Sequence, residues 1–66
     1  PLKECREVWK NANLEKIKED VSEYAVKKDD GREFVAEVFK GLVKGKKYDE
    51  YIMNLYKRLH GPIPHD

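Results

Sequence analysis

The sequence predicts an all-α fold, a small bundle of three to four helices that ends in a helical hairpin. Three observations predict it. Apolar residues recur at three- and four-residue spacing along most of the 66 residues. The strict alternation of apolar and polar residues that marks a half-buried strand is absent. Asparagine, aspartate, glycine and proline stand where the periodic segments stop.

Length and composition fit one small domain over residues 1–66, in a reducing compartment. A chain of 66 residues buries only about 60 % of its unfolded surface, so its core is marginal. Cys5 is the only cysteine, which argues against a disulfide-rich secreted scaffold and fits a small buried hydrophobe. Charged residues make up 41 % of the chain, yet the net charge is +1. Interspersed charges of both signs are typical of a solvated helical surface.

The sequence gives no reason to expect a membrane or a nucleic acid as partner. No apolar run approaches membrane-spanning length and no secretion signal is found, so we expect a cytoplasmic location. Lys44, Lys46 and Lys47 cluster, but Asp49 and Glu50 follow at once, and no one-sided basic block forms. The start at Pro1 and the proline-rich end indicate a fragment of a larger protein.

The first half of the chain predicts one or two helices. A first helix is expected over about residues 2–11 from the spacing of its apolar residues. Asn13 is a plausible N-cap for a second segment. The two segments are either separate helices or one bent helix. The apolar positions are Leu2, Cys5, Val8, Trp9 and Ala12 in the first segment, and Leu14, Ile17, Val21, Tyr24 and Ala25 in the second.

A third helix is expected over about residues 31–44, after a polar loop at 27–31. Asp30 and Glu33 resemble a capping box, with Asp30 as N-cap and Glu33 at the third helical position. Gly45 is a natural C-terminal cap. A wide apolar arc covers one side of this helix. It consists of Phe34, Val35, Val38, Phe39, Leu42 and Val43.

A fourth helix follows, capped by Asp49 and ended by Gly61-Pro62, and it completes the hairpin. Residues 63–66 should form a loose tail. The apolar stripe of this fourth helix consists of Tyr51, Ile52, Leu55, Tyr56 and Leu59. We expect the aromatic residues to lie in the core or at a seam with further sequence. They are Trp9, Phe34, Phe39, Tyr51 and Tyr56.

The third helix carries the most informative polar pattern of the chain. Glu33 and Glu37 lie one turn apart on one face, and like charges at this spacing mildly destabilise a helix. The pair is either an ordinary solvated face or a site for a cation or a partner. Glu33 could also serve only as a helix-capping group. Inside a helix, a glycine such as Gly41 costs roughly 1 kcal/mol of stability relative to alanine. Its presence is explained either by close packing at this position or by simple tolerance of the glycine.

The amino-acid sequence contains no recognisable catalytic motif. A catalytic zinc takes about three protein ligands and an open position for water, and no His-Glu-x-x-His segment is present. The only histidines, His60 and His65, lie on either side of Gly61-Pro62 and cannot share a helical face. They are interpreted as a helix-end and a tail histidine rather than a metal site.

Residues 21–62, about two-thirds of the chain, resemble the C-terminal end of lethal-factor-like zinc metallopeptidases (zincins), in the form associated with phage minor head proteins. The resemblance rests on Val-Ser-Glu-Tyr-Ala at 21–25, a polar loop, and Glu-Phe-Val-Ala-Glu-Val-Phe at 33–39. The continuation is also similar. It comprises Gly-Leu-Val at 41–43, Gly-Lys-Lys at 45–47, and Leu-Tyr-Lys-Arg-Leu at 55–59 before Gly61-Pro62.

The resemblance implies roles for three residues. Glu33 matches the third zinc ligand of the family, and Glu37 matches the carboxylate that supports a zinc-bound histidine. Tyr24 matches the tyrosine that faces the substrate and stabilises the developing oxyanion. A dication and a bound histidine would then offset the repulsion between the two glutamates.

Two functions follow from these considerations. The first is the C-terminal piece of a phage or prophage zinc metallopeptidase, inactive alone because the His-Glu-x-x-His helix is missing. The second is a non-catalytic helical interaction module of a phage head-morphogenesis protein. Zinc would then be a cofactor of the parent protein, and none is expected for this chain alone. The partners would be the remainder of the parent chain or a second copy held by exposed apolar surface, and the location would be cytoplasmic or virion-associated.

Overall fold

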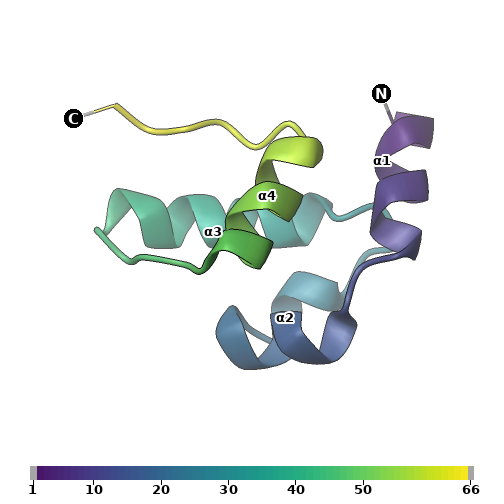
Figure 1. Cartoon of the computed structure of the whole chain (residues 1–66), viewed down its shortest axis with the longest axis horizontal. Helices are drawn as coiled ribbons and strands as arrows, with labels where there is room; N and C mark the ends of the chain where they lie inside the picture. Colours follow the sequence, from purple (N-terminus) through teal and green to yellow (C-terminus); the bar gives the residue numbers. More distant parts are fainter. Residues whose placement is uncertain (1, 66) are drawn as a thin grey trace.

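The computed structural model describes residues 2–65, apart from the side chain of Leu2, and it confirms the all-α class. Within this range the elements are α1 (Leu2–Lys10), α2 (Leu14–Asp20), the 3₁₀ turn η1 (Tyr24–Val26), α3 (Arg32–Val43) and α4 (Glu50–Arg58), with no strand (Figure 1). The radius of gyration is 10.8 Å, close to the value of about 11 Å expected for a compact chain of this length. The predictions for Pro1, Asp66 and the Leu2 side chain lie outside the described residues.

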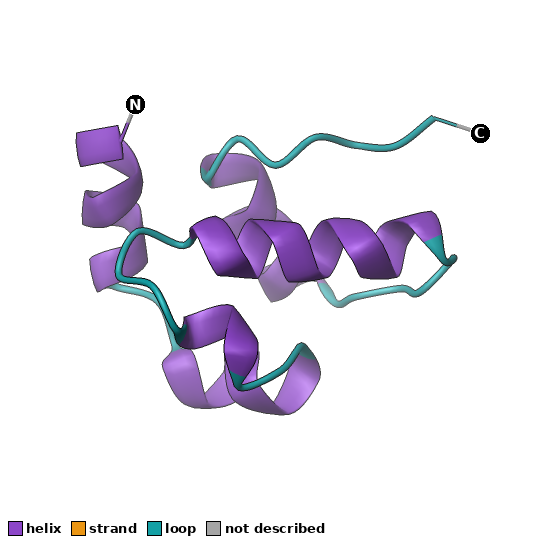
Figure 2. Ribbon diagram, turned by 180° about the vertical axis from the view of Figure 1, so that it is seen from behind, coloured by secondary structure: helices purple, strands orange, loops and turns teal. Residues whose placement is uncertain are grey.

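The longest helix, α3, organises the molecule. The turn η1 packs against both α2 and α3, and α4 packs against α3. Figure 1 shows α4 crossing α3, with α1 standing at one end of α3. Figure 2 shows from behind how the chain loops from η1 into the start of α3. The chain ends in two consecutive packed helices, as expected, but α4 runs across α3 rather than antiparallel to it.

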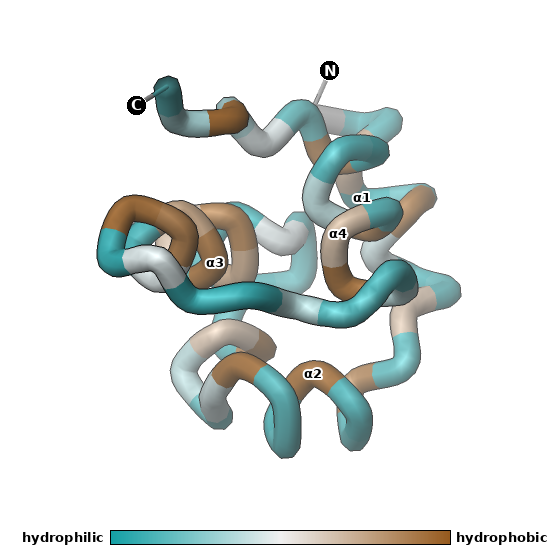
Figure 3. The backbone as a smooth tube through the Cα atoms, turned by 60° about the vertical axis from the view of Figure 1, so that its left-hand side comes forward, coloured by the Kyte–Doolittle hydropathy of each residue, from teal (hydrophilic) through white to brown (hydrophobic). Residues whose placement is uncertain are grey.

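The core is small and draws on every helix. Trp9 of α1 stacks at a tilt on Phe34 of α3, with ring centroids 5.5 Å apart. Figure 3 shows apolar stretches in α2, α3 and α4 separated by hydrophilic connections. Such burial is the main stabilising contribution in a chain this short. The buried apolar residues are Trp9, Ile17, Ala25, Phe34, Val38, Ile52, Leu55, Tyr56 and Leu59.

Two of the five aromatic residues expected in the core or at a seam with further sequence lie partly exposed, outside the core. Phe39 and Tyr51 are each 37 % exposed, and Val43 is 60 % exposed. Because α4 crosses α3, it covers a narrower arc than a parallel partner would. That arc is centred on Phe34 and Val38, both fully buried, and it leaves the far edge of the predicted apolar face open.

The first two segments are separate helices, and the second is shorter than its apolar spacing indicated. Asn13 caps α2 through its Oδ1, which accepts from the Lys16 amide at 3.1 Å. The helix ends after Asp20, where the amides of Val21 and Ser22 both bond to the Ile17 carbonyl. The Ser22 hydroxyl then accepts from the Ala25 amide at 3.2 Å. A serine that bonds the backbone locally competes with helix continuation, so Tyr24 and Ala25 belong to η1.

The predicted capping box at the start of α3 is wrong. Gly31 occupies the N-cap position with φ of 80°, a left-handed conformation suited to glycine. Glu33 is therefore the second helical residue, one position too early to reach back as a capping-box partner. Asp30 bonds forward instead: its Oδ1 accepts from the Arg32 amide at 3.0 Å, and its Oδ2 pairs with Arg32 Nη2 at 2.8 Å.

The C-terminal end of α3 follows the prediction. Gly45 has φ of 87°, and its amide bonds to the Leu42 carbonyl at 3.0 Å. The Lys46 amide bonds to the Gly41 carbonyl at 2.8 Å. This pair of hydrogen bonds is the Schellman motif, which satisfies carbonyls left open at a helix end.

The start of α4 also follows the prediction, and the helix ends at Arg58, shortly before Gly61-Pro62. Asp49 Oδ1 accepts from the Ile52 amide at 3.0 Å. At the other end His60, not Gly61, takes the left-handed conformation, with φ of 65°. Gly61 is required for a different reason, since a Cβ there would lie 2.3 Å from the buried ring of Tyr56. Residues 61–65 have no regular secondary structure, and the Tyr56 hydroxyl donates to the Pro62 carbonyl.

Candidate functional site

The candidate site is the polar face of α3 together with the turn η1 beside it. Glu33 and Glu37 are one turn apart on α3, which places their Cβ atoms about 6 Å from each other. Both residues are half-buried. The turn η1 packs directly on α3 and brings Tyr24 to the same part of the molecule. We call these three residues, Tyr24, Glu33 and Glu37, the acidic face.

The Glu37 carboxylate is held at both oxygens. Its Oε1 accepts from the Ser22 hydroxyl at 3.1 Å, and its Oε2 pairs with Lys40 Nζ at 2.8 Å. The bond to Lys40 is the main cause that lowers the pKa of Glu37, and the bond from Ser22 adds to it against the opposing effect of burial. Since the side chain is only 18 % exposed, this carboxylate is an oriented, ionised group.

Glu33 differs from Glu37 because its carboxylate has no fixed partner. Among residues 2–65 it takes part in none of the ion pairs. It lies in the first turn of α3, where the positive end of the helix dipole favours a negative charge. A half-buried carboxylate without an intramolecular partner is available to bind an external cation.

Tyr24 lies at the edge of this face with half of its surface exposed. The ammonium of Lys27 sits 5.6 Å from the centre of its ring. The hydrogen bond to Glu37 is the main cause that raises the pKa of Lys40, and the charge of Glu37 adds to it against the opposing effect of burial. Lys40 is fixed on this face by its ion pair with Glu37 Oε2 at 2.8 Å.

Sequence reasoning missed two residues of this neighbourhood, Ser22 and Tyr48. Ser22 stops α2 and fixes Glu37 at the same time. Tyr48 lies over Gly41, one turn beyond Glu37, and a Cβ on Gly41 would be 1.9 Å from its hydroxyl. Gly41 is thus explained by close packing. Burial raises the pKa of Tyr48, and the charge of Glu37 contributes. The position of Ser22 just before a turn could have indicated its role from the sequence. No sequence pattern indicated the role of Tyr48.

The acidic face offers a metal one unpaired, half-buried carboxylate, that of Glu33, rather than a complete site. In the part of the chain that the structure describes, no three His, Cys, Asp or Glu side chains are grouped so that they could hold a metal ion. His60 is engaged elsewhere, with its Nε2 3.0 Å from Glu4 Oε1 at the surface. Glu33 is chemically suited as one carboxylate ligand of a zinc ion whose histidine ligands come from another segment.

No protein-family model, curated protein or solved structure matches this chain. The helices at 2–65 include none with the length and apolar character needed to cross a membrane.

Proposed function

We propose that this chain is the C-terminal piece of a zincin-like metallopeptidase of the phage or prophage type, to which it contributes Glu33 as third zinc ligand. The observation that carries the proposal is the contrast between the two glutamates of α3. Glu37 is fixed by Ser22 and Lys40 at 3.1 and 2.8 Å. Glu33 has been left without an ion pair among the described residues.

Each residue of the acidic face then has a distinct task. Glu33 presents a carboxylate oxygen to the metal. Glu37, already oriented by the Ser22 hydroxyl, accepts the ring N–H of a histidine ligand and fixes its tautomer. Tyr24, with its ring half exposed, donates a hydrogen bond to a substrate carbonyl. A bound zinc ion would supply an activated water for peptide hydrolysis.

The remaining parts of such a site must come from elsewhere in a parent protein. Two histidine ligands and a general base are supplied in zincins by a His-Glu-x-x-His helix, and the 66 residues contain no such segment. The chain alone is therefore expected to hydrolyse no peptide. Its contribution is to hold the third ligand and its supporting groups on one rigid helix.

The proposal is tested on the full-length parent protein by replacing Glu33 with glutamine. The substitution keeps the shape of the side chain but removes its charge, so zinc content should fall to near zero while the helical circular dichroism is unchanged. Glu23→Gln is the matched control, since Glu23 is an exposed carboxylate beside Tyr24. Tyr24→Phe should retain zinc and lower kcat by about 10²-fold or more. Zinc retention in Glu33→Gln would refute the ligand assignment.

A second function, a non-catalytic interaction module, is favoured by the open edge of α3. Phe39 and Val43 lie one turn apart and are 37 % and 60 % exposed, an arrangement that a partner helix could cover. This function is tested by sedimentation of the chain at rising concentration, alone and as Phe39→Ser. Self-association that the substitution abolishes would support an interaction role, and a monomer at all concentrations would count against a second copy as partner.

A further inference from the structure

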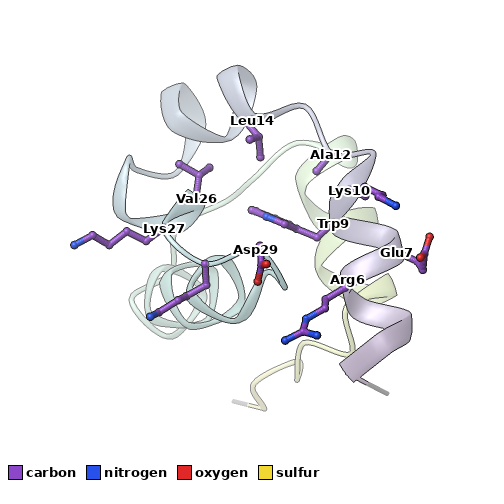
Figure 4. Close-up of a pocket in the computed structure, with 10 residues that line it drawn as sticks. Arg6, Glu7, Trp9, Lys10, Ala12, Leu14, Val26, Lys27 and Asp29 are labelled. Atoms are coloured by element: carbon purple, nitrogen blue, oxygen red, sulfur yellow. The ribbon is translucent and has the colours of Figure 1, made fainter.

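A second feature, independent of the acidic face, is a cleft between α1 and the segment from η1 to the following loop. It has a volume of about 540 Å³, within the range of roughly 300–1,000 Å³ found for ligand sites. Figure 4 shows Trp9, Leu14 and Val26 directed toward its interior. We call it the α1 cleft.

The floor of the α1 cleft is apolar and incompletely covered. Leu14 is 41 % exposed although it is a large aliphatic residue at the start of α2. Trp9 forms the adjoining wall and is itself anchored on Phe34. Only 5 % of the Trp9 surface is exposed, against 41 % for Leu14, so the floor offers an open leucine with the fixed edge of Trp9 beside it, which suits one bulky apolar side chain of a ligand.

The rim carries an excess of positive charge. Arg6, Lys10, Lys27 and Lys28 line the cleft, against the two carboxylates of Glu7 and Asp29. None of the four cations belongs to an ion pair within residues 2–65, and Lys27 in addition lies against the Tyr24 ring. Lys10 and Lys27 extend away from the interior (Figure 4). Long flexible cations around an apolar floor favour a ligand with carboxylates on both sides of an apolar group.

We propose that the α1 cleft binds a short acidic peptide segment that inserts one bulky apolar side chain against Leu14 and Trp9. Charge complementarity selects the acidic flanks, and the apolar floor selects the anchor. A nucleic acid is disfavoured as occupant because Glu7 and Asp29 would repel a continuous phosphate backbone and the floor offers it no polar partner.

Trp9 makes the proposal directly measurable, because it is the only tryptophan of the chain. The probe is a synthetic capped peptide with two glutamates on each side of one leucine. Added to the 66-residue chain at low salt, it should change Trp9 emission saturably and shift the backbone amide resonances of residues that line the cleft. The dissociation constant should rise with salt, since rim charges are screened.

Variants and matched peptides separate this site from general charge attraction. Leu14→Ser and Arg6→Glu should each raise the dissociation constant about tenfold, a change of about 1.4 kcal/mol, whereas Lys57→Glu on α4 should not. Replacing the glutamates by glutamine, or the leucine by serine, should weaken the peptide similarly. Circular dichroism verifies the fold of each variant. If Leu14→Ser does not fold, Arg6→Glu alone tests the proposal.

Three results would overturn the proposal. They are the absence of a saturable Trp9 response up to millimolar peptide, equal loss of binding in Lys57→Glu, and tighter binding of a single-stranded oligonucleotide than of the peptide. None of them bears on zinc binding by Glu33, so this proposal and the proposed function stand or fall separately.

Discussion

Two carboxylates near the start of α3 differ in their burial and in their bonding partners. Asp30 is almost fully buried, with 3 % of its surface exposed, and the Arg32 amide and guanidinium take up both of its oxygens. Glu33, three residues later, is half-buried and has no ion pair among residues 2–65. A buried polar group that is fully bonded serves the fold, whereas a carboxylate without a partner is available to a ligand. The comparison assigns Asp30 to the fold and leaves Glu33 open to the ligand role proposed above.

The strongest test of this comparison is Asp30→Ala, which should give the largest loss of stability among the substitutions considered. It removes the acceptor of the Arg32 amide and leaves a cavity beneath the start of α3. The urea unfolding midpoint should fall well below that of Glu33→Gln. Equal midpoints for the two variants would contradict the structural role of Asp30.

Acid should weaken the fold partly through Asp30. The hydrogen bonds from Arg32 lower the pKa of Asp30 from 3.8 to about 2. Because the pKa is lower in the folded state, the contribution to the free energy of unfolding is complete above about pH 4 and disappears as the pH falls toward 2. The stability difference between the wild type and Asp30→Asn, measured by urea unfolding at several pH values, should be constant above that window and shrink within it. A difference that does not change with pH would contradict the assignment.

Ser22→Ala should have a smaller effect, about 1 kcal/mol. The substitution removes the acceptor for the Ala25 amide and the donor to Glu37. The pKa of Glu37, followed by NMR titration, should rise because one bond to its charged form is lost. Ser22→Thr keeps the hydroxyl and is the control. An unchanged Glu37 pKa in Ser22→Ala would mean that Lys40 alone orients this carboxylate.

Glu33→Gln should have the smallest effect on the isolated chain, within about 0.5 kcal/mol of wild type. No described ion pair is broken by the substitution. Thermal or urea unfolding of the 66-residue chain checks it. A loss above about 1 kcal/mol would show that Glu33 is part of the structural framework, and the comparison with Asp30 would fail.

The sequence predicted those parts of the fold that depend on local spacing and capping. Asn13, Gly45 and Asp49 cap their helices as expected, because capping depends on side chains a few residues away. The sequence left open whether Phe39 and Tyr51 lie in the core or at a seam with further sequence, and the structure places both outside the core, because their burial depends on the angle at which α4 crosses α3. Helical periodicity does not encode that angle.

The candidate site was predictable only in part, for a similar reason. The spacing of Glu33 and Glu37 placed both on one face, which the structure retains. The capping box failed because Gly31 adopts a left-handed conformation, and this shifts the helix start by one residue. The bonds of Ser22 to Glu37 and the packing of Tyr48 on Gly41 join residues that are far apart along the chain. No local pattern marks such contacts.

The most direct test of the central claim is the zinc content of the full-length parent protein, measured for the wild type and for Glu33→Gln at matched folding. We predict about one zinc per chain in the wild type, a His-Glu-x-x-His segment upstream, and near-complete loss of the metal in the variant. A parent protein without zinc, or a variant that keeps it, would contradict the account and leave the acidic face as ordinary helix surface.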